Sequence, residues 1–221
     1  MKKQIDLKKT KVYSDFVFDF LNENKTLKDF YNLSFDIKNF KKQLDMKKSF
    51  PLLKRNILVK ELMSQYSDIE DKKVLNNINL LSKESTFTIT TGHQLNILTG
   101  PIFFIYKIIS IINLCLELKK KYPKNNFLPV FWLASEDHDF EEISEVYFRD
   151  KKINYLTKSK GSVGRMKLDD FSAFLDEIFK FFHTNNLAKR IKKIITSAYK
   201  DKSTLATATR SLIHQLFGDK G

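Results

Sequence analysis

The spacing of apolar residues divides the chain into a helical first part and a mixed middle. Between residues 15 and 81 the apolar positions recur mostly at helical spacing. The period then changes, because Thr86–Thr91 alternates β-branched and aromatic residues and stops at Gly92. This pattern predicts a strand that ends in a loop, preceded by a helical segment over residues 1–84.

A long helix and a second strand are predicted next. Thr99 or Gly100 can cap the helix, Pro101 suits its first turn, and Tyr122-Pro123 ends it. The run 127–134 is almost continuously apolar, as in strands that are buried on both faces. A strand, helix and strand of this length form a right-handed parallel unit, so both strands end at the same edge of the sheet.

The remainder predicts a small insertion and three helices. Beyond Phe140 we expect a short helix or strand to Phe148, then a hairpin or small insertion formed by 152–156 and 163–168. Helices are expected around residues 170–183, 185–197 and 203–217. The predicted parts are a helical segment (1–84), the first strand–helix–strand unit of an α/β, Rossmann-like core (85–150), and the insertion with its helices (151–221).

Composition favours a folded protein of the reducing cytoplasm. The 221 residues are 42% apolar and 13% aromatic, unlike a disordered chain. The lone Cys115 excludes an intrachain disulfide, and the first residues lack the apolar core of a secretory signal. Residues 101–118 are too short and too polar to cross a bilayer.

The net charge of +13 raises the possibility of a nucleic-acid partner. The charge lies at the two ends, however, since residues 61–150 hold 9 basic and 13 acidic residues. No basic stripe with interleaved aromatics is visible, and a high pI supports only non-specific attraction. We expect neither a nucleic-acid nor a membrane partner.

The first candidate segment follows the first strand and contains Gly92, His93, Gln94 and Asn96. Ligands of open α/β sheets bind at this edge, where helix N-termini favour phosphate or carboxylate. There, His93 can hydrogen-bond an anion as charge develops, although a loop histidine can also satisfy a backbone carbonyl. Gln94 and Asn96 can recognise polar substrate groups, or they can be ordinary loop residues.

The second candidate segment, Ser135-Glu136-Asp137-His138-Asp139, follows the apolar strand. Three carboxylates packed beside a buried strand favour a ligand over a solvated turn, because like charges raise carboxylate pKa values unless a cation neutralises them. Asp137 or Asp139 can hold a substrate ammonium and His138 can act as general base, whereas Glu141 or Glu142 can cap the next helix. We expect no bound metal, because consecutive ligands rarely converge on one ion.

Two basic features are candidates for phosphate binding. Lys107 lies within two turns of the start of the long helix, where it can extend to solvent or reach a phosphate. Residues 161–167, with Arg165 and Lys167, form either a phosphate-binding loop or a plain hairpin. Cys115 lies on the apolar face of the helix, so we expect it in the core.

Two long blocks resemble the cysteine-adding enzymes of bacillithiol biosynthesis, a family of cysteine ligases. They are 91–101 (TGHQLNILTGP) with Tyr106-Lys107, and 129–142 (PVFWLASEDHDFEE). Val163-Gly164-Arg165-Met166 and Leu216-Phe217-Gly218 are also similar to family sequence. The likeness covers roughly residues 85–221, and 1–84 match more loosely.

The resemblance implies a Rossmann-like core related to nucleotidyl-transferring synthetases, and a homodimer held by a coiled coil. The implied reaction joins cysteine to the amine of glucosaminyl malate with ATP, and Mg as its companion ion. The resemblance implies that Gly92, His93 and Gln94 of the first block and residues 135–139 of the second line the pocket. Taken with the candidates above, the expected site residues are His93, Asp137, His138 and Asp139 as catalytic groups; Gly92, Gln94, Asn96, Ser135 and Glu136 around the substrate; and Gly100, Lys107, Arg165 and Lys167 around the nucleotide.

Members of that family are more than twice as long as this chain. We therefore expect either a fragment or the product of a truncated gene, without the coiled coil and the remaining core strands. Two alternatives stay open: a metal-dependent hydrolase of a thiol–sugar conjugate, with Asp137, His138 and Asp139 as ligands, and a non-catalytic nucleotide-binding module.

Overall fold

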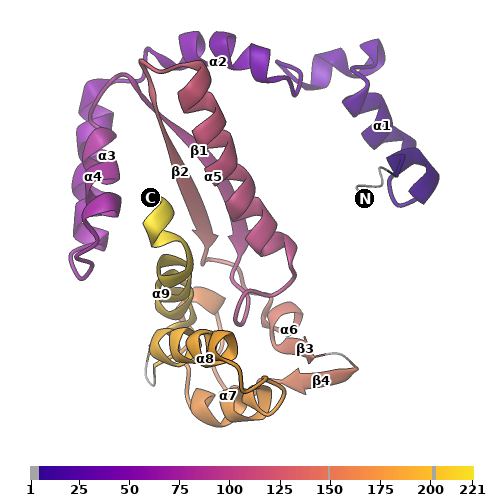
Figure 1. The fold of residues 1–221 in the computed structure, drawn as a ribbon, viewed down its shortest axis with the longest axis vertical. Helices are drawn as coiled ribbons and strands as arrows, with labels where there is room; N and C mark the ends of the chain where they lie inside the picture. The colour runs from indigo at the N-terminus through magenta and orange to yellow at the C-terminus, as the bar shows by residue number, and fades with distance from the viewer. Residues whose placement is uncertain (1–4, 149, 201–202) are drawn as a thin grey trace. The chain divides into compact units, whose positions relative to one another are not determined.

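A computed structural model describes residues 5–148, 150–200 and 203–221, which belong to two units, Met1–Phe50 and Pro51–Gly221 (Figure 1). The predicted boundaries at 84/85 and 150/151 lie elsewhere than this division and stay predictions. The first unit is built from short helical segments. They are the 3-10 helices Leu7–Thr10, Lys25–Phe30 and Ile37–Asn39, and the α-helices α1 (Asp15–Leu21) and α2 (Phe40–Lys47).

Asx caps begin the 3-10 helices of the first unit. The side chains of Asp6, Asn24 and Asp36 each accept a hydrogen bond from the backbone N–H two residues ahead. Such caps satisfy N–H groups that a helix end leaves without an internal partner. Local polar residues therefore define where the three 3-10 helices begin.

The second unit contains the predicted parallel pair. Strands β1 (Thr86–Gln94) and β2 (Asn126–Ala134) pair in parallel from Thr86↔Asn126 to Gln94↔Ala134, and α5 (Phe103–Lys121) connects them. Helix α5 packs on both strands through a buried face of Phe104, Ile108, Ile111, Cys115 and Leu118. The Rossmann-like prediction of a strand, crossover helix and parallel strand is confirmed.

A buried arginine fixes the start of β1. Two helices precede the strand, α3 (Leu52–Gln65) and α4 (Lys72–Leu80). Arg55 on α3 is 6% exposed, and its Nη1 donates to the carbonyl oxygens of Leu81, Lys83 and Thr86 at 3.0–3.1 Å. The guanidinium of Arg55 thereby ties α3 to the segment that leads into β1 and to its first residue.

The second half of this unit differs in detail from the prediction. After α6 (Phe140–Ile143), the hairpin is formed by β3 (Glu145–Phe148) and β4 (Lys151–Asn154). The expected pairing of 152–156 with 163–168 is wrong, because residues 163–165 form a 3-10 turn that packs elsewhere. Three helices follow close to the predicted ranges: α7 (Phe171–Phe179), α8 (Asn186–Ala198) and α9 (Leu205–Phe217), with a final 3-10 turn at Gly218–Lys220.

A large apolar core joins these helices to the loop after β1. Leu95 and Ile97, which are 0% and 2% exposed, belong to the same buried cluster as residues of all three helices. Tyr199, at the end of α8, stacks on Phe171 with ring centroids 4.8 Å apart. The apolar residues of the loop that follows β1 are therefore held by packing against distant helices.

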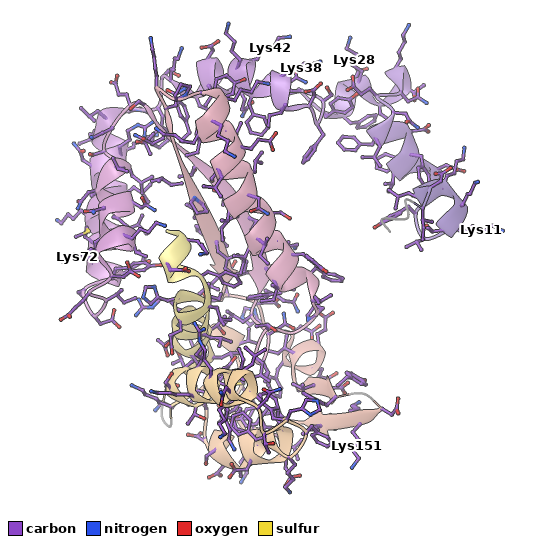
Figure 2. All side chains as sticks on the ribbon, in the orientation of Figure 1. Lys11, Lys28, Lys38, Lys42, Lys72 and Lys151 are labelled. Atoms are coloured by element: carbon purple, nitrogen blue, oxygen red, sulfur yellow. The ribbon has the colours of Figure 1, made fainter. Side chains whose placement is uncertain are left out.

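The positive charge lies on solvated faces. Lysines such as Lys72 on α4 are exposed (Figure 2), and exposed Lys151 on β4 has its Nζ 5.3 Å from the centroid of the Phe181 ring. None of the helices in the described ranges combines the length and the apolar character needed to cross a bilayer.

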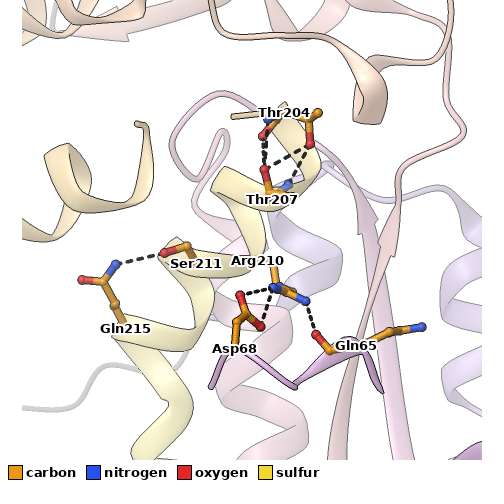
Figure 3. Close-up of polar contacts among 7 residues, drawn as sticks. All are labelled: Gln65, Asp68, Thr204, Thr207, Arg210, Ser211 and Gln215. Atoms are coloured by element: carbon orange, nitrogen blue, oxygen red, sulfur yellow. Dashed lines mark hydrogen bonds and ion pairs between the residues drawn. The ribbon is translucent and has the colours of Figure 1, made fainter. Parts of the chain in front are cut away.

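Helix α9 is also bound to the turn between α3 and α4 (Figure 3). Arg210 Nη2 contacts both carboxylate oxygens of Asp68 at 3.1 and 2.9 Å, and Nη1 donates to the Gln65 carbonyl. A capping box between Thr204 and Thr207 begins the helix. These contacts connect the end of the described chain to the helices that precede β1.

Candidate active site

The first candidate segment lies partly on β1 itself. The strand was expected to stop at Gly92, but it continues to Gln94 because β2 offers backbone partners up to Ala134. Gly92 is paired with Trp132, and a Cβ on Gly92 would lie 3.1 Å from the Trp132 carbonyl oxygen. This close approach explains a glycine inside a strand.

His93 is oriented by its Nδ1 nitrogen. That atom lies 3.0 Å from the Gln94 carbonyl oxygen and 3.3 Å from Asn96 Nδ2. The ring also packs against Phe104 of α5, with centroids 5.5 Å apart. Since Nδ1 is engaged with the backbone and Asn96, Nε2 is the nitrogen through which the half-buried ring can meet a ligand.

Asn96 shapes the loop that leads to α5. Its side chain is 7% exposed, and Nδ2 also donates to the Gln94 carbonyl at 3.2 Å. Gly100 has φ +55°, and a Cβ there would lie 2.6 Å from Asn96 Cβ. Helix α5 begins at Phe103, two residues after Pro101, and neither Thr99 nor Gly100 is its N-cap. Asn96 and Gly100 therefore have a structural part in building this turn.

Lys107 lies at the same sheet edge as the first segment. Its Nζ donates to the Gly92 carbonyl oxygen at 3.2 Å, and the side chain is otherwise exposed. A cationic group from α5 is therefore present where β1 ends. This position agrees with both predictions for Lys107, a side chain that extends to solvent and a side chain that reaches a phosphate.

The acidic loop, residues Ser135–Asp139, follows β2 and is exposed at Glu136, His138 and Asp139. The expectation of like charges packed in a buried setting is not met, because the loop faces solvent. Asp137 Oδ1 accepts from the Asp139 N–H at 3.1 Å, and Asp139 Oδ1 accepts from the Glu142 N–H at 3.2 Å. Asp139, and not Glu141 or Glu142, is thus the cap of α6.

One side-chain contact joins the first segment to α6, the helix that directly follows the acidic loop. Gln94 Nε2 donates to Glu142 Oε2 at 3.0 Å, which links the end of β1 to α6. The expected meeting of both segments at one sheet edge is therefore confirmed by the strand pairing and by this contact. Glu142 was missed as a partner, because its 48-residue separation from Gln94 leaves no local signal.

An open cleft of about 710 Å³ borders the acidic loop. Asp137, His138 and Asp139 line it, whereas His93, Gln94, Asn96, Gly100, Lys107, Arg165 and Lys167 do not. The remaining lining comes from Phe140, Glu141, Ser159, Lys160, Gly161, Val163 and Met166. The cleft thus combines three acidic side chains with one lysine, Lys160, which the sequence did not single out.

The basic segment 161–167 is a packed turn. Val163 and Gly164 are buried, and Lys167 forms an isolated antiparallel bridge with Thr204. Arg165 and Lys167 are exposed. The plain hairpin is therefore not formed by this segment, and its phosphate-binding role stays a prediction.

The described residues contain no cluster of side chains that could serve as metal ligands. Across 5–148, 150–200 and 203–221, no three His, Cys, Asp or Glu side chains gather as they would around an ion. Cys115 is 5% exposed in the core, as expected, and burial raises the pKa of its thiol to about 12. A thiol of that pKa is a poor nucleophile at neutral pH.

The parallel β1–β2 pair, with both candidate segments at one edge of the sheet, agrees with a family match. Residues 1–221 match the model of "Bacillithiol biosynthesis BshC, N-terminal Rossmann-like domain". The chain belongs to the BshC family. This assignment confirms the resemblance based on the blocks 91–101 and 129–142.

Curated relatives in the BshC family carry the name "Putative cysteine ligase BshC". Over 98% of its own length, the chain is 45% identical to the relative from Flavobacterium psychrophilum. It is 44% identical to the Flavobacterium johnsoniae relative over 95% of its own length, and 33% identical to the Natranaerobius thermophilus relative over 96%. The matched regions cover 41%, 40% and 40% of these relatives. The chain thus spans about two fifths of their length.

Proposed function

We propose that this chain contains the cysteine-binding part of a ligase that joins the cysteine carboxyl to the amine of glucosaminyl malate and so completes bacillithiol. The main support is the parallel β1–β2 pair, because it brings the Gly92–Gln94 and Ser135–Asp139 segments to one edge, bridged by Gln94 and Glu142. The names of the BshC relatives support the reaction class. The complete activity belongs to a protein of their length.

The cleft suits a zwitterionic amino acid. Asp137 and Asp139 each use Oδ1 for a backbone N–H, which orients the carboxylate and leaves Oδ2 to accept from an ammonium group. Lys160 supplies a cation in the same cleft for a carboxylate. In this proposal His138, which is exposed and lines the cleft, takes the proton from the attacking amine.

His93 and the basic residues are proposed to handle the nucleotide. ATP with Mg, when bound, supplies the free energy for amide formation by activating the cysteine carboxyl. His93 presents Nε2 to developing negative charge, as Nδ1 is held by its neighbours. Lys107 offers a cation at the end of β1, and Gly100, Arg165 and Lys167 complete the proposed phosphate contacts.

We further propose that the complete ligase is a cytoplasmic homodimer held by a coiled coil, as the resemblance implies for proteins of the relatives' length. Gly92, Asn96, Ser135 and Glu136, which do not line the cleft, are proposed to border the substrate from the adjoining sheet edge. The hydrolase alternative is not favoured, because Asp137, His138 and Asp139 form no metal-ligand set in the described part of the chain.

The test is a gene deletion in the organism that carries this chain, with thiols measured by mass spectrometry. Loss of bacillithiol with accumulation of glucosaminyl malate, reversed by the native gene, supports the ligase. Persistence of bacillithiol in the deletion strain overturns it.

Two variants then test the site. In the purified protein encoded by the gene, Asp137→Asn is expected to raise the KM for cysteine about fivefold, because an ammonium contact at a partly exposed site contributes about 1 kcal/mol. Glu84→Gln removes the same charge from an exposed position before β1 and serves as the control. Equal KM values in the two variants contradict the assignment of Asp137.

A further inference from the structure

The acidic loop contains no helix or strand, and besides the hydrogen bond between Asp137 and Asp139 it is held by contacts with another segment. Three consecutive residues supply these contacts. Val163 N–H donates to the Asp137 carbonyl at 2.7 Å, Gly164 N–H donates to the Ser135 carbonyl at 3.0 Å, and Ser162 Oγ donates to the same Ser135 oxygen. Two carbonyls on either side of Glu136 are thereby fixed by one turn.

Gly164 is required by space. A Cβ on Gly164 would lie 2.4 Å from the Ser135 carbonyl oxygen, 2.5 Å from Ser135 Cβ and 2.9 Å from Ser135 Cα. Two of these atoms belong to the backbone, so no rotamer change can relieve the clash. Gly161 differs, since it has φ +93° and a Cβ there would meet no atom within 4 Å, so its requirement is conformational.

The turn is itself anchored in the helical core. Val163 and Met166 are 2% and 5% exposed. The Met166 carbonyl accepts from the N–H of Leu205, the first residue of α9, and the Leu168 N–H donates to the Ser203 carbonyl. The same segment supplies Ser159, Lys160, Gly161, Val163 and Met166 to the lining of the cleft. The distance between the two sides of the cleft therefore depends on how closely Gly164 approaches Ser135.

We propose that Gly164 is a positioning residue, which sets the place of the acidic loop and with it the Asp137 and Asp139 carboxylates in the cleft. The proposal rests on the function proposed above for its enzymatic consequence, but its structural consequence is independent of that function. In this view the helical core acts on the geometry of the substrate cleft through residues 162–164, and the close approach of Gly164 to Ser135 sets their distance from the acidic loop.

The experiment compares Gly164→Ala with Gly218→Ala in the purified protein encoded by the gene. Gly218 is also buried, but a Cβ there meets mainly the His214 ring, away from the acidic loop. We expect amide hydrogen exchange of residues 135–140 to accelerate about tenfold in Gly164→Ala and to stay unchanged in Gly218→Ala. We also expect the KM for cysteine to rise about tenfold or more in Gly164→Ala, with a smaller change in the KM for glucosaminyl malate.

The outcomes separate the two proposals. If the unsubstituted protein does not ligate cysteine but exchange in 135–140 still responds only to Gly164→Ala, the proposed function fails and the positioning role stands. Unchanged exchange and an unchanged KM for cysteine overturn the positioning role. If Gly164→Ala does not fold, Ser162→Ala decides: it removes one donor from Ser135, and exchange that stays unchanged in 135–140 overturns the proposal.

Discussion

Arg55→Met removes the donor that holds three backbone carbonyls before and at the start of β1 while keeping most of the apolar stem. Nη1 has two hydrogens, so it satisfies two of the carbonyls of Leu81, Lys83 and Thr86 fully at any moment. Hydrogen bonds from a charged donor contribute about 1.5–3 kcal/mol each, which gives about 3–6 kcal/mol. Methionine does not carry the cost of burying a charged guanidinium, and this gain offsets part of the lost hydrogen-bond energy. We therefore expect a loss of about 3 kcal/mol in the free energy of unfolding.

Urea denaturation followed by circular dichroism measures this loss. With a slope of about 2 kcal/mol per molar urea, the midpoint is expected to fall by about 1.5 M. The control is Lys54→Met, which changes an exposed neighbour on the same helix and is expected to stay within about 0.5 kcal/mol. A loss below about 1 kcal/mol in Arg55→Met refutes the argument, because the three carbonyls would then have adequate partners without the guanidinium.

Two further predictions concern buried groups. Burial raises the pKa of Cys115 to about 12, above its unfolded value near 9. The folded chain is therefore expected to resist thiol reagents at about pH 8, and its free energy of unfolding is expected to fall as the pH rises from about 9 to about 12. Equal labelling rates with and without urea contradict the first expectation. Tyr199 OH donates to the Leu98 carbonyl at 3.2 Å, so Tyr199→Phe is expected to cost about 1 kcal/mol in urea denaturation. Tyr147→Phe, at an exposed hydroxyl bonded to Glu145, serves as its control and is expected to change stability by less than about 0.5 kcal/mol.

The pattern of residues 86–134 was sufficient to predict the parallel unit and the meeting of its two loops. Alternation in the first strand, the apolar run of the second and Pro123 after the helix are local signals, and the right-handed crossover follows from chain chirality. The acidic run after β2 was also visible in the sequence, and the structure places Asp137, His138 and Asp139 along one cleft. Their catalytic roles stay predictions.

Tertiary structure decided what depends on partners distant in the chain. Strand β1 extends through Gly92 and His93 because β2, 40 residues later, continues its hydrogen-bonded ladder. The hairpin forms from residues 145–148 with 151–154, because residues 163–165 are held against the acidic loop. The space around Gly164 is likewise set by Ser135, 29 residues away. Sequence alone determined the periodic helices and strands, because the hydrophobic period and turn residues act locally. Tertiary structure determined the strand ends, the close backbone approaches and the cleft, because backbone groups and side-chain volumes are matched only when distant segments meet.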